Sequence, residues 1–173
     1  MRIYTASELD TERGETGFLI LVYGPTGVGK SVSAIQTADA PILYVCCESR
    51  DPRKFLKEAK RSGVDIDFVF YDKFDDVMEF FAERRNFEKY KTIIIDSITF
   101  LSLGVSREIE DEGYAALSDK KQQDKPLTMR GKQSLEGFGA LGNHLLRFTT
   151  LTGNLTQMGK DVIMIAIMDE NPS

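Results

Sequence analysis

Five short, mainly apolar runs alternate along this chain with longer and more polar stretches. The runs lie at residues 18–23, 42–47, 67–71, 92–96 and 162–168. They are rich in β-branched and aromatic residues, which is typical of strands that are buried in a sheet. Strands that alternate with helices favour parallel pairing with helices on both faces. The pattern therefore predicts an α/β fold with a mostly parallel sheet of about five strands.

The stretches between the runs differ in how clearly they indicate helices. Short apolar stripes predict helices at 31–38, 51–63 and 75–86. Residues 135–158 carry leucine and phenylalanine at spacings of three and four, which predicts a long amphipathic helix in spite of four glycines. Residues 97–133 lack this regularity. There we expect a short apolar continuation, then a charged stretch and a basic loop at 118–133 near the mouth of the sheet.

Composition and charge narrow the class of protein. The chain has 173 residues, of which 42% are hydrophobic and 28% charged, as in an ordinary globular protein. We expect a single domain over residues 1–173, with a polar lead-in at 1–16. The net charge of −5 argues against a polycation that attracts nucleic acid as a whole. It does not exclude a local basic patch. The sequence shows neither an apolar run of about 20 residues nor a signal-peptide core, so we expect a cytoplasmic protein without membrane contacts.

The two cysteines, Cys46 and Cys47, are neighbours in the second apolar run. Successive side chains of a strand point to opposite faces, so these two are not expected to pair with each other. We expect two buried free thiols, as is usual in a reducing compartment.

A glycine-rich segment follows the first apolar run directly. It fills every fixed position of the phosphate-binding pattern G-x-x-x-x-G-K-S and reads Gly24-Pro25-Thr26-Gly27-Val28-Gly29-Lys30-Ser31. The glycines allow the backbone N–H groups to wrap around phosphate oxygens, and the helix that follows adds the positive end of its dipole. Lys30 is expected to reach the β- and γ-phosphates, and Ser31 to bind Mg²⁺. The segment predicts a nucleoside triphosphate as ligand.

Acidic residues end three of the predicted strands near this loop. Asp96 follows three isoleucines in a Walker B pattern and would hold Mg²⁺ through Ser31 or through water. Glu48 ends the second strand and would orient or deprotonate the water that attacks the γ-phosphate. A solvated acid that caps the next helix is the alternative for Glu48. Asp169 and Glu170 follow the fifth strand, either as sensors of the γ-phosphate or as part of a charged loop.

The order of these parts resembles that of RecA-type ATPases from about residue 18 to residue 170. The resemblance is carried by the phosphate loop, the strand that ends in Glu48, Asp51-Pro52 after it, and Asp96-Ser97 at the end of the fourth strand. Within that superfamily the chain is most similar to phage-encoded RecA-like nucleotide-binding proteins, some of which act as single-strand annealing recombinases. If the chain is phage-encoded, its expected location is the host cytoplasm.

The resemblance implies a function and several site residues. It implies Mg-dependent ATP hydrolysis with Glu48 and Lys30 as catalytic residues, and it places Asp51 near the adenine. Residues 104–133 correspond to the first DNA-binding loop, which makes single-stranded DNA an expected partner. The candidate DNA contacts are Lys120, Lys121, Lys125, Arg130 and Lys132. A ring or filament of copies, or other recombination proteins, are further expected partners, and the C-terminal part of the family fold is expected to be missing.

Other functions stay open at this point. A solvated surface loop is the plain alternative for the basic segment. A small-molecule or nucleotide kinase uses the same phosphate loop, but it usually carries an arginine-rich lid, and residues 118–133 contain one arginine, Arg130. A module that binds nucleotide and hydrolyses it slowly or not at all is a third possibility. A GTPase is disfavoured because the sequence has no Asn-Lys-x-Asp segment.

Overall fold

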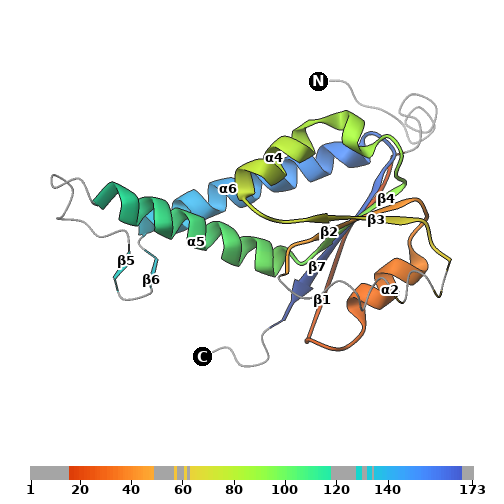
Figure 1. Cartoon of the computed structure of the whole chain (residues 1–173), viewed down its shortest axis with the longest axis horizontal. Helices are drawn as coiled ribbons and strands as arrows, with labels where there is room; N and C mark the ends of the chain where they lie inside the picture. The colour runs from red at the N-terminus through yellow and green to blue at the C-terminus, as the bar shows by residue number, and fades with distance from the viewer. Residues whose placement is uncertain are drawn as a thin grey trace, which may run out of the picture.

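The computed structural model describes residues 16–48, 57, 61, 63–117, 128–129, 132–133 and 135–168. Its centre is a sheet of five strands in the order β1-β7-β4-β2-β3, and every neighbouring pair is parallel (Figure 1). The strands are β1 (Leu19–Gly24), β2 (Ile42–Cys46), β3 (Ile66–Phe70), β4 (Thr92–Asp96) and β7 (Asp161–Ile167). Each falls on one of the five apolar runs, so the predicted α/β fold with a parallel sheet is confirmed.

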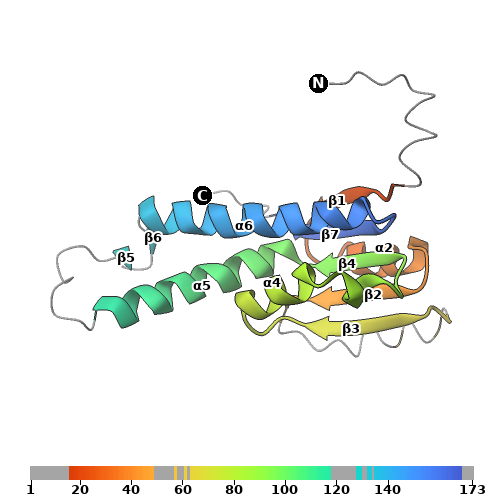
Figure 2. The same cartoon turned by 90° about the horizontal axis from the view of Figure 1, so that it is seen from above.

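Helices cover both faces of this sheet, as predicted (Figures 1 and 2). In the described part of the chain these helices are α2 (Lys30–Thr37), α4 (Phe74–Ala82), α5 (Ile98–Leu117) and α6 (Leu135–Thr156), with a 3-10 turn at Arg84–Phe87. Most of the helix predicted at 51–63 lies outside the described residues. α2 packs on one face through Ala34 and Ile35, and the other three helices pack on the opposite face. Ile93 and Ile95 of β4 face those three helices, whereas Ile94 faces α2. β2 and β4 are buried along their whole length, which explains their unbroken apolar runs.

The largest difference from the predicted elements is α5. A single helix of 20 residues occupies Ile98–Leu117, where the sequence indicates only a short apolar continuation. Its first turns pack into the core through Leu101 and Val105, which are 0% and 1% exposed. The helix then continues beyond the sheet beside α6 (Figure 2), so no long apolar stripe marks it in the sequence. Neither α5 nor any other helix in the described part of the chain is long and apolar enough to cross a bilayer.

The basic segment at 118–133 is described only in part. Residues 118–127 lie outside the described residues, whereas Thr128–Met129 (β5) and Lys132–Gln133 (β6) form a small antiparallel ladder rather than a loop. Both views place this ladder at the outer end of the α5–α6 pair (Figures 1 and 2). A helix of the length of α5 spans about 30 Å. The described part of the segment is therefore a short ladder rather than the expected loop, and it lies at the end of α5 that is away from the sheet (Figure 2).

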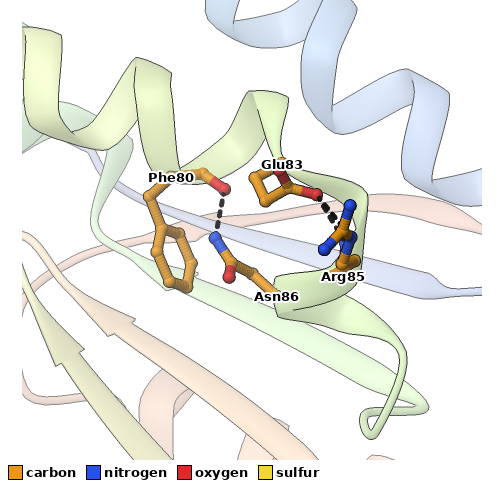
Figure 3. Close-up of polar contacts among 4 residues, drawn as sticks. All are labelled: Phe80, Glu83, Arg85 and Asn86. Carbon is orange, nitrogen blue, oxygen red and sulfur yellow. Dashed lines mark hydrogen bonds and ion pairs between the residues drawn. The ribbon is translucent and has the colours of Figure 1, made fainter.

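The third predicted helix ends earlier than expected, at Ala82. Glu83 leaves the helical conformation and a 3-10 turn follows. The Asn86 side chain donates a 2.9 Å hydrogen bond to the carbonyl of Phe80 (Figure 3). The Glu83 carboxylate accepts the backbone N–H of Arg85 and pairs with its guanidinium at 3.7 Å. Polar side chains thus make hydrogen bonds to backbone groups that have no partner within the helix at its end. The spacing of apolar residues does not indicate such bonds, so it predicts too late an end for this helix.

A carboxylate from α5 holds the start of α4. The two oxygens of Glu108 accept the backbone N–H of Phe74 at 3.1 and 3.2 Å, and one of them also accepts the hydroxyl of Tyr71 at 2.5 Å. The N-cap residue of α4 makes no capping bond with its own side chain, so Glu108 takes that role from the neighbouring helix. A Cβ at Gly104 would come within 2.9 Å of the Tyr71 ring, so α5 lies very close to the β3–α4 connection.

β1 forms one edge of the sheet and leaves much of its apolar surface exposed. Among the described strands it pairs only with β7. Phe18 and Tyr23 are each 69% exposed, and Leu19, Ile20 and Leu21 are about half exposed. Alternate residues of β1 bond to β7, so the N–H and C=O groups of Leu19, Leu21 and Tyr23 point to the other edge.

Replacing Glu108 with alanine should lower the free energy of unfolding by about 1–2 kcal/mol, because Phe74 N–H and the Tyr71 hydroxyl lose their acceptor. Urea unfolding followed by circular dichroism measures the change. Glu79→Ala, at an exposed position of α4, is the control and should stay within about 0.5 kcal/mol of the unchanged protein. Equal losses in the two variants would show that Glu108 does not act as the cap.

Candidate functional site

The segment 24–31 leads from the end of β1 into α2. Gly27 and Gly29 have φ values of 86° and 92°, in the left-handed region that favours glycine. A Cβ built on either glycine meets no atom within 4 Å, so the space around them is open and the backbone conformation is what requires glycine. Gly29 is also the N-cap of α2 and provides no side-chain cap. The N–H groups of the first turn are therefore available to an anion at the positive end of the helix dipole.

Lys30 lies across this loop. Its Nζ donates hydrogen bonds to the carbonyls of Gly24 and Pro25, both at 2.7 Å. An ammonium group has three donors, so two of them brace the loop and keep the positive charge within it. A positive charge among backbone N–H groups is the arrangement that binds phosphate in proteins.

Asp96 joins three elements at one point. It ends β4, the middle strand of the sheet, and is 7% exposed. Ser31, in the first turn of α2, donates a hydrogen bond from Oγ to Asp96 Oδ2 at 2.5 Å. The hydroxyl of Tyr44, from β2, donates to the same oxygen. The sequence predicts that Asp96 lies beside the phosphate loop, and the structure places it there.

Tyr44 is the member of this cluster that the sequence analysis misses. Its side chain is fully buried. Burial above all, then the charge and the hydrogen bond of Asp96, raises the pKa of Tyr44 well above its usual range, so the phenol stays protonated. A signal was present in the sequence, because Tyr44 brings a hydroxyl into an otherwise apolar strand that ends two residues later. A buried tyrosine hydroxyl normally has a hydrogen-bond partner.

Glu48 follows β2 at the same edge of the sheet. The N–H of Cys47 donates to the carbonyl of Asp96 at 2.7 Å, so the ends of β2 and β4 lie side by side. Glu48 lines a pocket of about 240 Å³ together with Lys30, Ser31 and Asp96. The other lining residues are Thr26, Gly27, Gly29, Val32, Ile165 and Ile167. Glu48, the residue that the sequence proposes as the base, thus lines the pocket that contains the phosphate loop.

The oxygen atoms of this pocket fit Mg²⁺ better than a cation that needs an all-protein cage. Mg²⁺ usually keeps several waters and binds one or two protein oxygens together with phosphate oxygens. Ser31 Oγ and the Asp96 carboxylate are two such oxygens at hydrogen-bond distance from each other. In the described part of the chain, no group of three or more His, Cys, Asp or Glu residues could hold a metal ion. The site therefore suits a cation that binds together with a phosphate.

Cys46 and Cys47 are free and buried, as predicted. Cys46 belongs to the core beneath α2, and Cys47 belongs to the core on the opposite face. Burial raises the pKa of both thiols. Both thiols therefore favour the protonated form, as is usual for buried cysteines.

Several predicted site residues lie outside the described part of the chain. They are Asp51, Lys120, Lys121, Lys125, Arg130, Asp169 and Glu170. Lys132 is described only by its backbone position in β6. The roles of these residues in adenine binding, phosphate sensing and DNA binding stay predictions.

Comparison with known proteins supports the same fold and family. The structure is similar to that of a KaiC-like protein from the hyperthermophilic archaeon Pyrococcus horikoshii, with a TM-score of 0.51 and 17% sequence identity. The similarity covers 91% of this chain and 64% of that protein, so the chain spans less than two thirds of its length. It shows a RecA-type P-loop fold. No curated protein matches the chain. A sequence model of the AAA domain family matches residues 16–173, and the chain belongs to that family.

Proposed function

We propose that this chain is a magnesium-dependent ATPase that acts on single-stranded DNA, as a RecA-like recombination or annealing protein. Membership of the AAA domain family and the RecA-type fold indicate nucleotide binding and hydrolysis. The observation that carries the ATPase proposal is the 2.5 Å hydrogen bond between Ser31 and Asp96 beside an open glycine loop. It puts a pair of cation ligands next to a phosphate cradle, which is the arrangement that Mg-ATP requires.

Each residue of the pocket has its own role in this proposal. Lys30 neutralises the negative charge between the β- and γ-phosphates, and the loop N–H groups hold their oxygens. Ser31 and Asp96 hold Mg²⁺, which supplies further charge neutralisation at the phosphate oxygens when bound. Glu48 orients the attacking water and accepts its proton. A base beside water fits hydrolysis better than transfer to a phosphate acceptor, which favours an ATPase over a kinase.

The DNA part of the proposal rests on the resemblance to RecA-type proteins and on the basic segment. Five Lys and Arg residues lie between positions 120 and 132 of a chain whose net charge is −5. Such a cluster attracts a phosphate backbone without reading its sequence. The described part of this segment, the β5–β6 ladder, lies at the outer end of α5 and α6 (Figure 2). Copies of this chain in a ring or filament would align several such ends along one strand.

Lys30→Ala should weaken ATP binding by about 100-fold or more, because the phosphates lose a charged hydrogen-bond donor. Isothermal titration calorimetry with Mg-ATP measures the affinity. Lys91→Ala is the control, since Lys91 is exposed and precedes β4 at the opposite end of that strand. Wild-type affinity in the Lys30 variant would mean that the loop does not hold the phosphates.

Glu48→Gln should keep the affinity for Mg-ATP and lower turnover by about 10²–10⁴-fold, because the amide keeps the shape but cannot accept a proton. Phosphate release measures turnover, and calorimetry measures binding. Glu79→Gln, at an exposed site on α4, should change neither quantity. Unchanged turnover in the Glu48 variant would move the role of base to Asp169 or Glu170, or would indicate a kinase.

Reversing the charge of Lys120 and Lys121 to glutamate should weaken binding to a labelled single-stranded oligonucleotide and reduce the slope of affinity against salt. Fluorescence anisotropy at several salt concentrations measures both. The matched control reverses Arg84 and Lys91, two exposed basic residues away from the α5–α6 end. The same affinity and salt slope in both double variants would place the DNA site elsewhere.

A further inference from the structure

Tyr44 is a buried residue whose hydroxyl donates a hydrogen bond to Asp96. Its side chain is 0% exposed and belongs to the core beneath α2, with Ile42, Ile94 and Ile165 among its members. Phenylalanine would fill the same space without bringing a hydroxyl out of water. A buried hydroxyl is costly unless it is hydrogen-bonded, so the hydroxyl of Tyr44 needs a partner inside the protein.

The strand register brings that hydroxyl to Asp96. Tyr44 lies opposite Ile94, and Cys46 lies opposite Asp96 in the β2–β4 pair. Tyr44 and Asp96 are therefore diagonal neighbours on one face of the sheet, a distance that a long aromatic side chain spans. Phe68 of β3 supports the ring from the other side, with ring centroids 5.4 Å apart. The hydroxyl is thus held in place by packing on both neighbouring strands.

Two donors meet at a single carboxylate oxygen. Ser31 Oγ and the Tyr44 hydroxyl both donate to Asp96 Oδ2. Together they fix the rotation of the carboxylate and leave Oδ1 for other partners. Ser31 Oγ keeps lone pairs besides the proton that it gives to Asp96, and these can bind a cation. Tyr44 itself does not line the pocket, so it acts on the pocket through Asp96.

We propose that Tyr44 is a positioning residue for the magnesium site: its hydroxyl orients Asp96 so that Asp96 accepts the Ser31 proton and the serine oxygen turns to the cation. This inference rests on the proposed function of the same pocket. Partners behind a metal ligand commonly change metal affinity by about 10–100-fold when they are removed. Removing the hydroxyl of Tyr44 should therefore raise the Mg²⁺ concentration that ATP binding requires, and it should leave contacts with the nucleotide itself unchanged.

Tyr44→Phe tests this directly. Calorimetric ATP affinity is measured at increasing Mg²⁺ and again in EDTA, so that the readout does not depend on turnover. The Mg²⁺ concentration that gives half of the affinity gain should rise about tenfold, while the affinity in EDTA stays unchanged. Asp96→Asn should shift the magnesium requirement in the same direction. In the Asp96→Asn background, Tyr44→Phe should add less than about twofold, because the two residues act as one unit.

Two control variants separate the hydroxyl from packing. Tyr90→Phe removes a hydroxyl that donates to Asp67 at 2.8 Å outside the pocket, and it should leave the magnesium requirement unchanged. Phe68→Leu loosens the support of the Tyr44 ring but keeps the hydroxyl, so it should lower the melting temperature without an equal shift in magnesium. An equal shift in Phe68→Leu would assign the effect to packing and overturn the inference.

The outcomes for the inference and for the proposed function are distinct. If Asp96→Asn shifts the magnesium requirement and Tyr44→Phe does not, Tyr44 has no positioning role and the magnesium site stands. If Mg²⁺ does not raise the ATP affinity of the wild-type protein, the proposed magnesium site itself is wrong. If Tyr44→Phe weakens binding equally with and without Mg²⁺, the hydroxyl supports the nucleotide loop and not the cation.

Discussion

The hydrogen bond from Ser31 to Asp96 ties the phosphate loop to the middle of the sheet. β1, which leads into the loop, is separated from β4 by β7, so the loop carries the chain across to bring Ser31, in the first turn of α2, to the end of β4. A buried carboxylate is costly unless donors satisfy it, and Ser31 and Tyr44 supply them. Side chains from α2, β2 and β4 are therefore fixed at one atom. The position of the loop above the sheet follows from that constraint.

Much of this arrangement could be predicted from the sequence, and the exceptions share a physical cause. The strands were predictable because burial on both faces requires unbroken apolar runs, and Ser31 and Asp96 were predictable because a phosphate loop restricts residue types. α5 was missed because much of its length packs beside another helix beyond the sheet. The roles of Glu108 and Tyr44 were missed because each depends on a partner from another element, which no local pattern records.

α5 connects the two regions to which the proposals assign function. It begins at Ile98, two residues after Asp96, and its other end lies near the ladder of β5 and β6 (Figure 1). Its first turn is fixed at the sheet, where Thr99 Oγ1 accepts the N–H of Ile167 at 2.9 Å. Glu108 then fixes its middle to the start of α4. One helix, held at two points, thus connects the end of β4 at the nucleotide pocket with the part of the chain that leads to the β5–β6 ladder.

The exposed edge of β1 has a consequence for how the loop is anchored. An apolar edge strand with open N–H and C=O groups is a template for another strand, whether from a partner or from an unwanted aggregate. The same strand ends in Gly24, whose carbonyl holds Lys30. A strand laid along Leu19 and Leu21 would therefore stiffen the base of the phosphate loop from outside.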